Sequence, residues 1–271
     1  MRVTQALALA RSQGLTRLDA QLLLCHHLQR PRSWLLAHDH ELLPPAIEVA
    51  LRDDFVQRAA GVPLAYLTGE REFHGLRLAV TPAVLDPRPD TETLVDWALQ
   101  WLSGRTRPTV LDLGTGSGAI AIAVAHARPD AIVTATDLDA AALAVARANA
   151  HTHGVVLECL LGSWWTPLGG RRFDLVLSNP PYIAADDTHL AALGHEPQHA
   201  LTPGGDGLDA LRTLAAGAAL HLQPTGAVIL EHGFDQAAAV RTLLHGAGLV
   251  AAQTRTDLGG QDRCTGACRA G

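Results

Sequence analysis

The sequence predicts an α/β protein in which a wound parallel β-sheet follows a small helical domain. Before about residue 60, apolar residues recur every three or four positions, which is the period of amphipathic helices. After Pro108, short β-branched runs alternate with helical segments of about 10 to 15 residues, the pattern of parallel βαβ units. Hydrophobic residues form 48% of the chain and charged residues 18%, so a folded protein with a substantial core is expected.

The first predicted domain is a helical bundle over residues 1–70, in which no catalytic constellation is evident. Thr16 and Ser33 each precede an apolar helical run and are expected to be N-caps, because their hydroxyls can accept a bond from a free backbone N–H. The Pro44–Pro45 pair marks the start of a further helix, since proline fits the first helical turn. Because it lacks reactive groups, this domain is predicted to recognise a partner.

Residues 71–88 are expected to form a hairpin connector, and residues 89–271 the domain that carries the sheet. The run from Phe73 to Val80 has the alternation of a β-hairpin, with a glycine inside it. Asp90 or Thr91 is expected to cap the helix that follows.

Within the second domain, predicted strands and helices alternate from residue 109 onward. The strands are expected at 109–114, 131–137, 155–161, 173–180 and 226–233, and the helices at 118–127, 140–150, 208–222 and in a segment through Leu244, followed by two extended runs. In parallel sheets of this kind, ligands bind beyond the carboxyl ends of the strands. Each polar signature of the sequence follows such an end, so the site is expected at that edge.

The first polar signature is the glycine-rich stretch LDLGTGSG, residues 111–118. Gly114, Gly116 and Gly118 allow a tight turn from strand to helix and let a ligand touch the backbone. Their spacing differs from the G-x-G-x-x-G of dinucleotide sites, which weakens NAD as the ligand without eliminating it. Asp137 closes the next strand, where a carboxylate can accept hydrogen bonds from both hydroxyls of a ribose. The loop and Asp137 together predict a cofactor that contains adenosine.

The second signature is the stretch NPPY, Asn179 to Tyr182, at the end of the fourth predicted strand. The plain interpretation is a loop, because proline lacks a backbone N–H and fixes its own φ angle. The chemical interpretation needs a reaction that uses the amide and the ring. An NPPY loop after a nucleotide-binding half resembles the class I S-adenosylmethionine-dependent methyltransferases that act on planar nitrogens.

Several stretches together resemble the PrmC/HemK family, the release factor N5-glutamine methyltransferases. In order along the chain they are PLAYLTGEREFHGL, VLDPRPDTETLV, LDLGTGSGAIAIAVA, SNPPYI, HEPQHALTPGGDGLDALR, LEHG and DLGGQDR, and the resemblance covers nearly all of residues 18–263. It implies a Rossmann-like class I methyltransferase sheet, with S-adenosyl-L-methionine as cofactor and S-adenosyl-L-homocysteine as product. The implied partner is a class 1 peptide chain release factor, methylated on the glutamine of its GGQ motif.

The resemblance also implies site residues. The residues expected to bind the substrate and take part in catalysis are Asn179, Pro180, Pro181 and Tyr182. Those expected to bind the cofactor are Gly114, Thr115, Gly116, Ser117, Gly118, Asp137, Trp164 and Asn179. Further contacts with cofactor or substrate are expected from Thr91, Glu92 and Asp112. Ser163 stands where the family often has an acid, and Asp86, which replaces an apolar residue, is interpreted as a solvated turn carboxylate. Glu196 and Pro197 either shape the substrate entrance or have a structural role.

The expected chemistry follows from the weak nucleophilicity of an amide nitrogen, whose resonance is on the scale of ~18–20 kcal/mol. The Asn179 side-chain oxygen and the Pro180 carbonyl can each accept one N–H of the substrate amide, and Tyr182 can lie on its plane. Such hydrogen bonds lower the activation barrier by only ~3–4 kcal/mol each, well below the resonance energy of the amide. The positive sulfonium of the cofactor must therefore supply much of the remaining lowering, and alignment of the reacting atoms supplies ~7–11 kcal/mol. No general base is expected, since the proton can leave after methyl transfer.

Two rival functions fit parts of the sequence. A DNA adenine methyltransferase shares the NPPY loop, but the chain has no evident target-recognition domain, and its net charge of -6 disfavours binding to phosphates. A noncatalytic nucleotide-binding protein would keep the glycine loop and Asp137 but would not need Asn179 or Tyr182. We therefore expect no direct nucleic-acid binding.

Metal and membrane roles are not expected. The four cysteines are scattered, and a metal role for Cys264 and Cys268 is disfavoured because they lie in a stretch that alternates like a strand. The fourteen histidines do not stand with carboxylates or cysteines at ligand spacing. No cleavable leader and no apolar run of about 18 residues is evident, so a cytoplasmic protein is expected.

Overall fold

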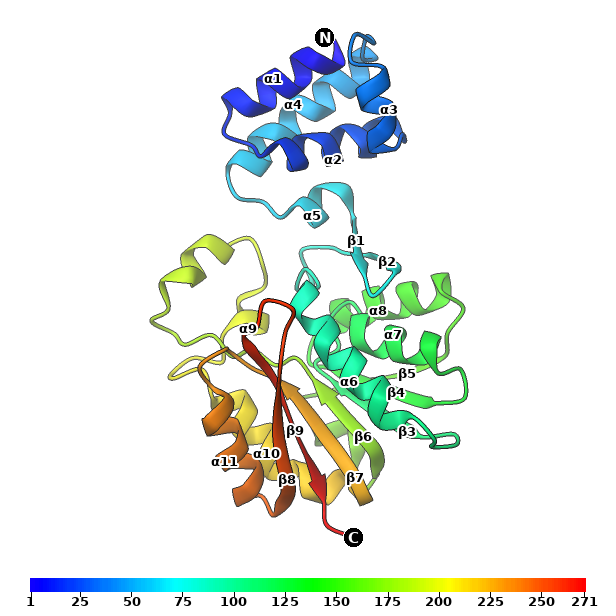
Figure 1. Ribbon diagram of the computed structural model, residues 1–271, viewed down its shortest axis with the longest axis vertical. Coiled ribbons are helices and arrows are strands. Elements are labelled where there is room, and N and C mark those ends of the chain that lie inside the picture. Colours follow the sequence, from blue (N-terminus) through cyan, green and yellow to red (C-terminus); the bar gives the residue numbers. More distant parts are fainter. The chain divides into compact units, whose positions relative to one another are not determined.

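The computed structural model describes residues 1–271, and the chain folds into two compact units, Met1–Glu70 and Arg71–Gly271. Figure 1 shows the first unit as a group of helices and the second as a sheet covered by helices. None of the helices combines the length and the apolar character that a membrane-spanning segment needs. No three His, Cys, Asp or Glu side chains are grouped so that they could hold a metal ion.

The N-terminal unit is a helical bundle, as predicted. Its helices are α1 (Val3–Ser12), α2 (Arg17–Leu28), α3 (Arg32–Ala37), α4 (Pro45–Ala59) and the short α5 (Leu64–Thr68). Leu23 and Leu24 of α2 and Leu51 and Phe55 of α4 are fully buried in its core. The unit therefore has its own apolar core, which is what the helical period of the sequence indicated.

The starts of these helices test the predicted caps. Thr16 caps α2, because its hydroxyl accepts the Asp19 backbone N–H at 3.0 Å, and Pro45 occupies the first turn of α4. The predicted cap at Ser33 is wrong, since the N-cap of α3 is Pro31, two residues earlier. Helix α5 was not predicted, because five residues are too few to show a helical period.

The hairpin, which begins at the last residue of the first unit, consists of β1 (Glu70–Phe73) and β2 (Leu76–Ala79). His74 and Gly75 between them both have positive φ angles, 50° and 76°, as a two-residue hairpin turn that matches strand twist requires. A turn of 3-10 helix, Pro89–Thr91, then leads into α6 (Glu92–Leu102). Thr91 occupies the N-cap position of α6 but its side chain makes no capping bond, so the predicted cap is not formed.

The sheet has seven strands in the order β5-β4-β3-β6-β7-β9-β8. They are β3 (Thr109–Leu113), β4 (Ile132–Asp137), β5 (Leu157–Leu161), β6 (Phe173–Ser178), β7 (Leu222–Glu231), β8 (Leu249–Thr256) and β9 (Asp262–Arg269). The first five pair in parallel, and β9 pairs antiparallel with both β7 and β8. The wound sheet is confirmed, while the antiparallel insertion of β9 was not predicted.

Helices cover both faces of the sheet, as Figure 1 shows. One face carries α6, α7 (Ala119–Ala127) and α8 (Ala140–Thr152), and the other carries α10 (Asp209–His221) and α11 (Ala237–Gly246); α9 (Gln198–Leu201) is a short helix outside these layers. Because successive strand residues point to opposite faces, Val110 and Leu175 enter the first core, whereas Leu111 and Val176 enter the second. Burial on both faces explains why these strands are continuously apolar.

The strand order reverses beside β3, which has β4 on one side and β6 on the other. Ligands of such sheets bind at this switch point, beyond the carboxyl ends of the strands. Gly114 follows β3, Asp137 ends β4, Asn179 follows β6 and Glu231 ends β7. Residues that are far apart in the sequence thus meet at one edge of the sheet.

Candidate active site

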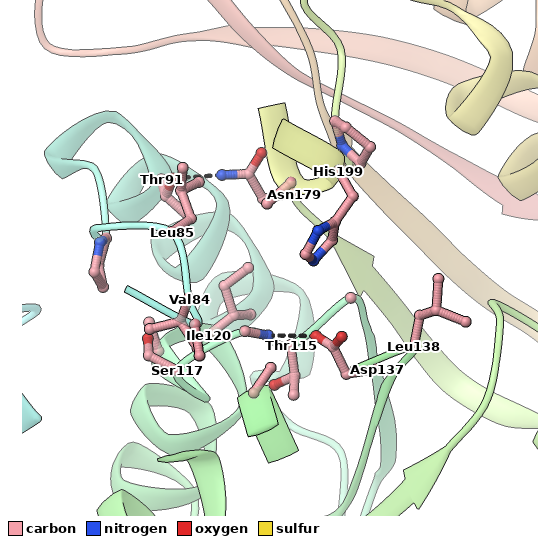
Figure 2. A pocket seen from close by; sticks show the side chains of 18 of the residues that line it. Val84, Leu85, Thr91, Thr115, Ser117, Ile120, Asp137, Leu138, Asn179 and His199 are labelled. Atoms are coloured by element: carbon pink, nitrogen blue, oxygen red, sulfur yellow. Dashed lines mark hydrogen bonds between the residues drawn. The ribbon is translucent and has the colours of Figure 1, made fainter. Parts of the chain in front are cut away.

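A cavity of about 170 Å³ opens at this edge. Nine of the predicted site residues line it, namely Thr91, Gly114, Thr115, Gly116, Ser117, Asp137, Trp164, Asn179 and Pro181. Figure 2 shows Thr91 and Asn179 at one end of the cavity and Asp137 at the other. The space suits a small organic molecule, and apolar side chains such as Ile120 and Leu138 supply much of the wall.

Gly114 and Trp164 shape the wall near the glycine loop. Gly114 has a φ of 73°, and a Cβ at this position would lie 3.3 Å from the Trp164 ring. Trp164 itself has a φ of 45°, which is rare for a bulky residue and is the kind of backbone strain found at ligand sites. The loop therefore requires glycine at 114 so that the indole can pack against the backbone.

Asp137 presents a carboxylate that the backbone holds in place. Its Oδ2 accepts the Gly116 N–H at 2.8 Å, and its Oδ1 accepts the Asp139 N–H at 3.0 Å (Figure 2 shows the first of these bonds). Each carboxylate oxygen can accept a further hydrogen bond. Asp137 is therefore an immobilised acceptor at the cavity, as its position at the end of a strand predicted.

Asp112 and Gly118, for which contacts with cofactor or substrate were expected, do not line the cavity. Asp112 is fully buried beneath the loop, where its Oδ2 accepts the Thr115 hydroxyl at 2.6 Å, and burial raises its pKa to about 7. Gly118 begins α7 with a φ of 85°, and a Cβ there would lie 2.8 Å from Ile122 of the same helix. Asp112 thus supports the loop from behind, because its side chain has no exposed surface, and Gly118 allows α7 to begin close to the loop.

The amide of Asn179 is held at the other end of the cavity. Its Nδ2 donates to the Thr91 hydroxyl oxygen at 3.0 Å, a bond drawn in Figure 2. Pro181 lines the cavity beside it, whereas the Pro180 ring is buried and does not. With its nitrogen committed to Thr91, Asn179 has its oxygen Oδ1 free to accept a hydrogen bond from a ligand.

Tyr182 lies outside the lining of the cavity. Its ring packs against the core beneath α10 and α11, and its hydroxyl donates to Oε1 of Glu231 at 3.2 Å. Burial, and next the negative charge of Glu231, raise the pKa of the Tyr182 hydroxyl, while burial raises the pKa of Glu231 to about 7. The ring therefore supports the loop from the side of the core, and its stacking on a substrate stays a prediction.

Glu92 and Asp86 are also placed differently from expectation. Glu92 does not line the cavity, because its carboxylate accepts the His74 backbone N–H at 3.0 Å in the hairpin turn. Asp86 is 6% exposed rather than solvated; burial raises its pKa, whereas Arg71 and Arg88 act in the opposite direction. These carboxylates fix the connector that forms one wall of the cavity.

The comparisons with known proteins address the whole chain. A family model of the PrmC N-terminal domain matches residues 2–69, and a model of the methyltransferase small domain matches residues 91–208. The release factor glutamine methyltransferase of Bordetella pertussis is 54% identical over 256 residues, which cover 93% of this chain and 95% of that protein. The chain belongs to the release factor glutamine methyltransferase family. The release factor glutamine methyltransferase of Pseudomonas aeruginosa is 44% identical to this chain, over 92% of this chain and 91% of that protein.

Solved structures support the fold of this family member. A methyltransferase from Pyrococcus furiosus superposes with a TM-score of 0.53 at 19% identity, covering 72% of this chain and 90% of that one. The 16S rRNA N2 G1207 methyltransferase of T. thermophilus, in complex with AdoMet and guanosine, gives 0.57 at 21% identity, covering 74% and 49%. At such identities the likeness concerns the Rossmann-like methyltransferase fold alone, which confirms the predicted fold class.

Sequence reasoning missed part of the wall in this methyltransferase. His199 of α9 lines the cavity, as does the connector from Ala83 to Arg88. Glu196, which is 5% exposed, accepts hydrogen bonds from the Asp86 backbone N–H and the Arg88 guanidinium, and so ties the segment before α9 to that connector. Both His199 and Glu196 belong to the stretch HEPQHAL, which the family resemblance had already indicated. The stretch has no strand or helix periodicity, so the sequence did not show which of its side chains would face the cavity.

Proposed function

We propose that the protein transfers a methyl group from S-adenosyl-L-methionine to the N5 amide nitrogen of the glutamine in the GGQ motif of class 1 peptide chain release factors. The observation that carries the proposal is the Asn179 amide, which lines the cavity and whose nitrogen is bonded to Thr91, leaving the oxygen to accept a hydrogen bond from a substrate. A fixed oxygen acceptor suits the N–H of a substrate carboxamide. Membership of the release factor glutamine methyltransferases supports the choice of substrate.

The cofactor is proposed to bind between the glycine loop and Asp137. The immobilised Asp137 carboxylate would accept the ribose hydroxyls, and the Trp164 ring and Leu138 would cover the adenine with apolar surface. Gly114 and Gly116 keep the backbone open to a close approach by the ligand. When bound, S-adenosyl-L-methionine supplies a methyl group carried on a positively charged sulfur.

The substrate amide is proposed to be held by the NPPY loop. Asn179 Oδ1 would accept one N–H and the Pro180 carbonyl the other, so that the nitrogen lone pair is turned toward the cofactor. Two consecutive prolines suit this task, because they remove two backbone N–H donors beside the carbonyl that would accept the substrate N–H. Holding both hydrogens orients the nitrogen and increases its electron density, and the proton leaves after the transfer.

The two units are proposed to have different functions, catalysis and recognition of the substrate. Residues 89–271 would carry out methyl transfer, residues 71–88 would connect the units, and residues 1–70 would recognise the release factor. A substrate that acts in translation places the reaction in the cytoplasm. We propose no direct contact with nucleic acid, since the net charge of -6 opposes general binding to phosphates.

The deciding experiment is methyl transfer from labelled S-adenosyl-L-methionine to purified substrates. Intact class 1 release factor is expected to be labelled, and mass spectrometry should place the methyl group on the GGQ glutamine. A release factor with asparagine at that position should remain unlabelled. Labelling of duplex DNA in place of the release factor would identify an adenine methyltransferase, and cofactor binding without any transfer would identify a noncatalytic binding protein.

We predict that Asp137→Ala weakens S-adenosyl-L-methionine binding by roughly 10- to 100-fold, the effect of losing hydrogen bonds to a charged acceptor. Calorimetry gives the dissociation constant, and the melting temperature reports whether the fold is intact. Asp139→Asn is the matched control, because it removes a carboxylate two residues away that caps α8 and lies outside the cavity, and asparagine caps equally well. Equal affinity in Asp137→Ala and wild type would exclude the proposed ribose contact.

A variant lacking residues 1–62 is predicted to bind cofactor normally and to lose methylation of intact release factor. The reason is that the second unit has its own core and contains every residue that lines the cavity. Calorimetry checks cofactor binding, and labelled methyl transfer checks activity. Full activity of this variant on intact release factor would show that residues 1–70 are not needed for recognition.

A further inference from the structure

Phe234 is the only exposed phenylalanine of the chain. The other three, Phe55, Phe73 and Phe173, are at most 2% exposed, whereas Phe234 is 63% exposed. It follows the stretch LEHG and lies in the loop between β7 and α11. A single apolar side chain in water is ordinary on a protein surface, but Phe234 is not the only one on the loops at this edge of the sheet.

Leu258 is fully exposed in the turn between β8 and β9, within the stretch DLGGQDR. Hydrogen bonds hold this turn in one conformation. The Asp257 backbone N–H donates to the Gln261 carbonyl at 2.9 Å, and Asp257 Oδ1 accepts the Gln261 backbone N–H at 3.0 Å. An ordered turn therefore holds a leucine side chain in water, which lowers the entropy that a partner would lose on contact with it.

The two loops lie next to each other at the carboxyl edge of the sheet. β7 pairs with β9, and beyond the end of β7 the His232 backbone N–H donates to the Arg263 carbonyl at 2.9 Å. The cavity opens at this same edge, where Asn179 follows β6. Phe234 and Leu258 are therefore on the side of the sheet from which a substrate must arrive.

Both loops are also tied to the surroundings of Asn179. In the first loop, Gln236 Nε2 donates to the backbone carbonyl of Tyr182, the last residue of NPPY, at 3.0 Å. In the second, Arg263 forms an ion pair with Asp90 at 3.5 Å, and Asp90 precedes the Thr91 that accepts the Asn179 amide. The two loops thus border the end of the cavity at which Asn179 lies.

A protein substrate needs such a border. The cavity has room for a cofactor and one side-chain amide, so the residues on either side of the substrate glutamine must stay outside it. Two or three residues of extended chain span roughly 7–11 Å, so these residues would lie on the loops around the opening. Phe234 and Leu258 do not line the cavity but protrude beside it, which suits contact with a polypeptide rather than with a small ligand.

The charge of the two loops narrows the chemistry of the segment that they would bind. They carry Asp235, Asp257 and Asp262 but only one cation, Arg263, which is paired with Asp257 at 2.9 Å. Asp235 is exposed directly beside Phe234. A segment with apolar side chains and a neighbouring positive charge therefore complements this surface.

We infer that Phe234 and Leu258 form an apolar rim that binds apolar side chains of the release factor next to the methylated glutamine. The inference rests on the proposed function, since it assumes that the glutamine amide is held at Asn179. Binding on the rim would bring the substrate chain to the opening of the cavity, and so contribute to affinity for the protein substrate rather than to the chemical step.

The first test measures methylation of intact release factor by Phe234→Ala, Leu258→Ala and the double variant at saturating cofactor. KM for release factor should rise roughly 5- to 10-fold in each single variant, as expected when an apolar interface contact is truncated, and further in the double variant. The value of kcat and the affinity for S-adenosyl-L-methionine should stay within about twofold. Phe234→Leu and Leu258→Met keep an apolar side chain and should recover most of the lost affinity.

The matched controls are Leu220→Ala and Val156→Ala. Leu220 is 68% and Val156 is 89% exposed, but they stand just before the amino ends of β7 and β5, at the opposite edge of the sheet. Their KM for release factor should equal that of wild type. The melting temperatures of all these variants should match wild type, because exposed side chains contribute little to stability.

The second test locates the partner of the rim by photo-crosslinking. Leu258 is replaced by p-benzoylphenylalanine, and the protein is irradiated with intact release factor and S-adenosyl-L-homocysteine. Mass spectrometry should find the crosslink within about five residues of the substrate glutamine, the reach of an extended segment around the opening. The same replacement at Val156 should give no crosslink to release factor.

Four results would overturn the inference. They are an unchanged KM in the double variant, an effect on kcat alone, a crosslink to a distant part of the release factor, and a crosslink between two copies of this chain, which would identify a dimer contact. Failure of the proposed function is distinguishable from all four, because wild-type protein would then not methylate release factor at all.

Discussion

Asn179→Ala is expected to lower kcat for release factor methylation by roughly 10²- to 10³-fold, the loss typical of one preorganised acceptor at a reacting group. The substitution removes the oxygen that would accept a substrate N–H, and with it the hydrogen-bonded amide at the end of the cavity. Because this bond is proposed to strengthen as the nitrogen attacks, its loss should appear in turnover. Single-turnover assays at saturating cofactor and release factor measure it.

Cofactor affinity is the internal control for this variant. Asn179 and Asp137 lie at opposite ends of the cavity in Figure 2, so the dissociation constant for S-adenosyl-L-methionine should stay within about threefold of wild type. A variant that binds cofactor tenfold more weakly and turns over normally would assign Asn179 to the cofactor. Our account of the NPPY loop would then be wrong.

Tyr182→Ala is expected to lose both stability and activity, whereas Tyr182→Phe should lose chiefly stability. The ring packs against the core beneath α10 and α11, so alanine should lower the free energy of unfolding by ~3–5 kcal/mol and displace the loop that carries Asn179. Phenylalanine keeps the ring and removes only the hydroxyl bond to Glu231, at a cost of about 1–3 kcal/mol. Denaturant unfolding and methyl-transfer assays on both variants measure these effects.

The relative activities of these two variants show whether Tyr182 only supports the loop or takes part in the reaction through its hydroxyl. Burial and the charge of Glu231 raise the pKa of the Tyr182 hydroxyl, which makes it a poor proton acceptor or donor at neutral pH. If Tyr182→Phe is nevertheless as inactive as Tyr182→Ala, while remaining folded, the hydroxyl takes part in the reaction. Tyr182 would then belong to the catalytic group rather than to its support.

The fold could be predicted to the extent that it depends on local periodicity. The strand ending at Asp137 and the helix that follows it were found because apolar runs and helical periods are properties of neighbouring residues. The antiparallel position of β9 could not be found in this way. Its residues alternate like those of any strand, and its partners β7 and β8 are chosen by long-range pairing that no local pattern encodes.

The site shows the same division between local and long-range information. Gly114, Asp137 and Asn179 were predicted because each ends a strand, and all three line the cavity. Asp112 and Tyr182 belong to the same motifs but lie away from the lining, since a motif names residues without showing which way each side chain points. Glu231 ends a strand as well, yet its hydrogen bond with Tyr182 joins segments that are far apart in the sequence.

The place of β9 has a consequence for the order in which the protein folds. β9 follows β8 in the sequence but lies between β8 and β7, so β8 joins the sheet only through β9. Glu231 pairs with Cys264 of β9, and until the β8–β9 hairpin docks, β7 is an open edge with this carboxylate in water. Hairpins form early because they are local, whereas docking one onto a distant strand is slower. We therefore expect the parallel strands to assemble first, and the burial of Glu231 to be completed only when the last hairpin closes the sheet.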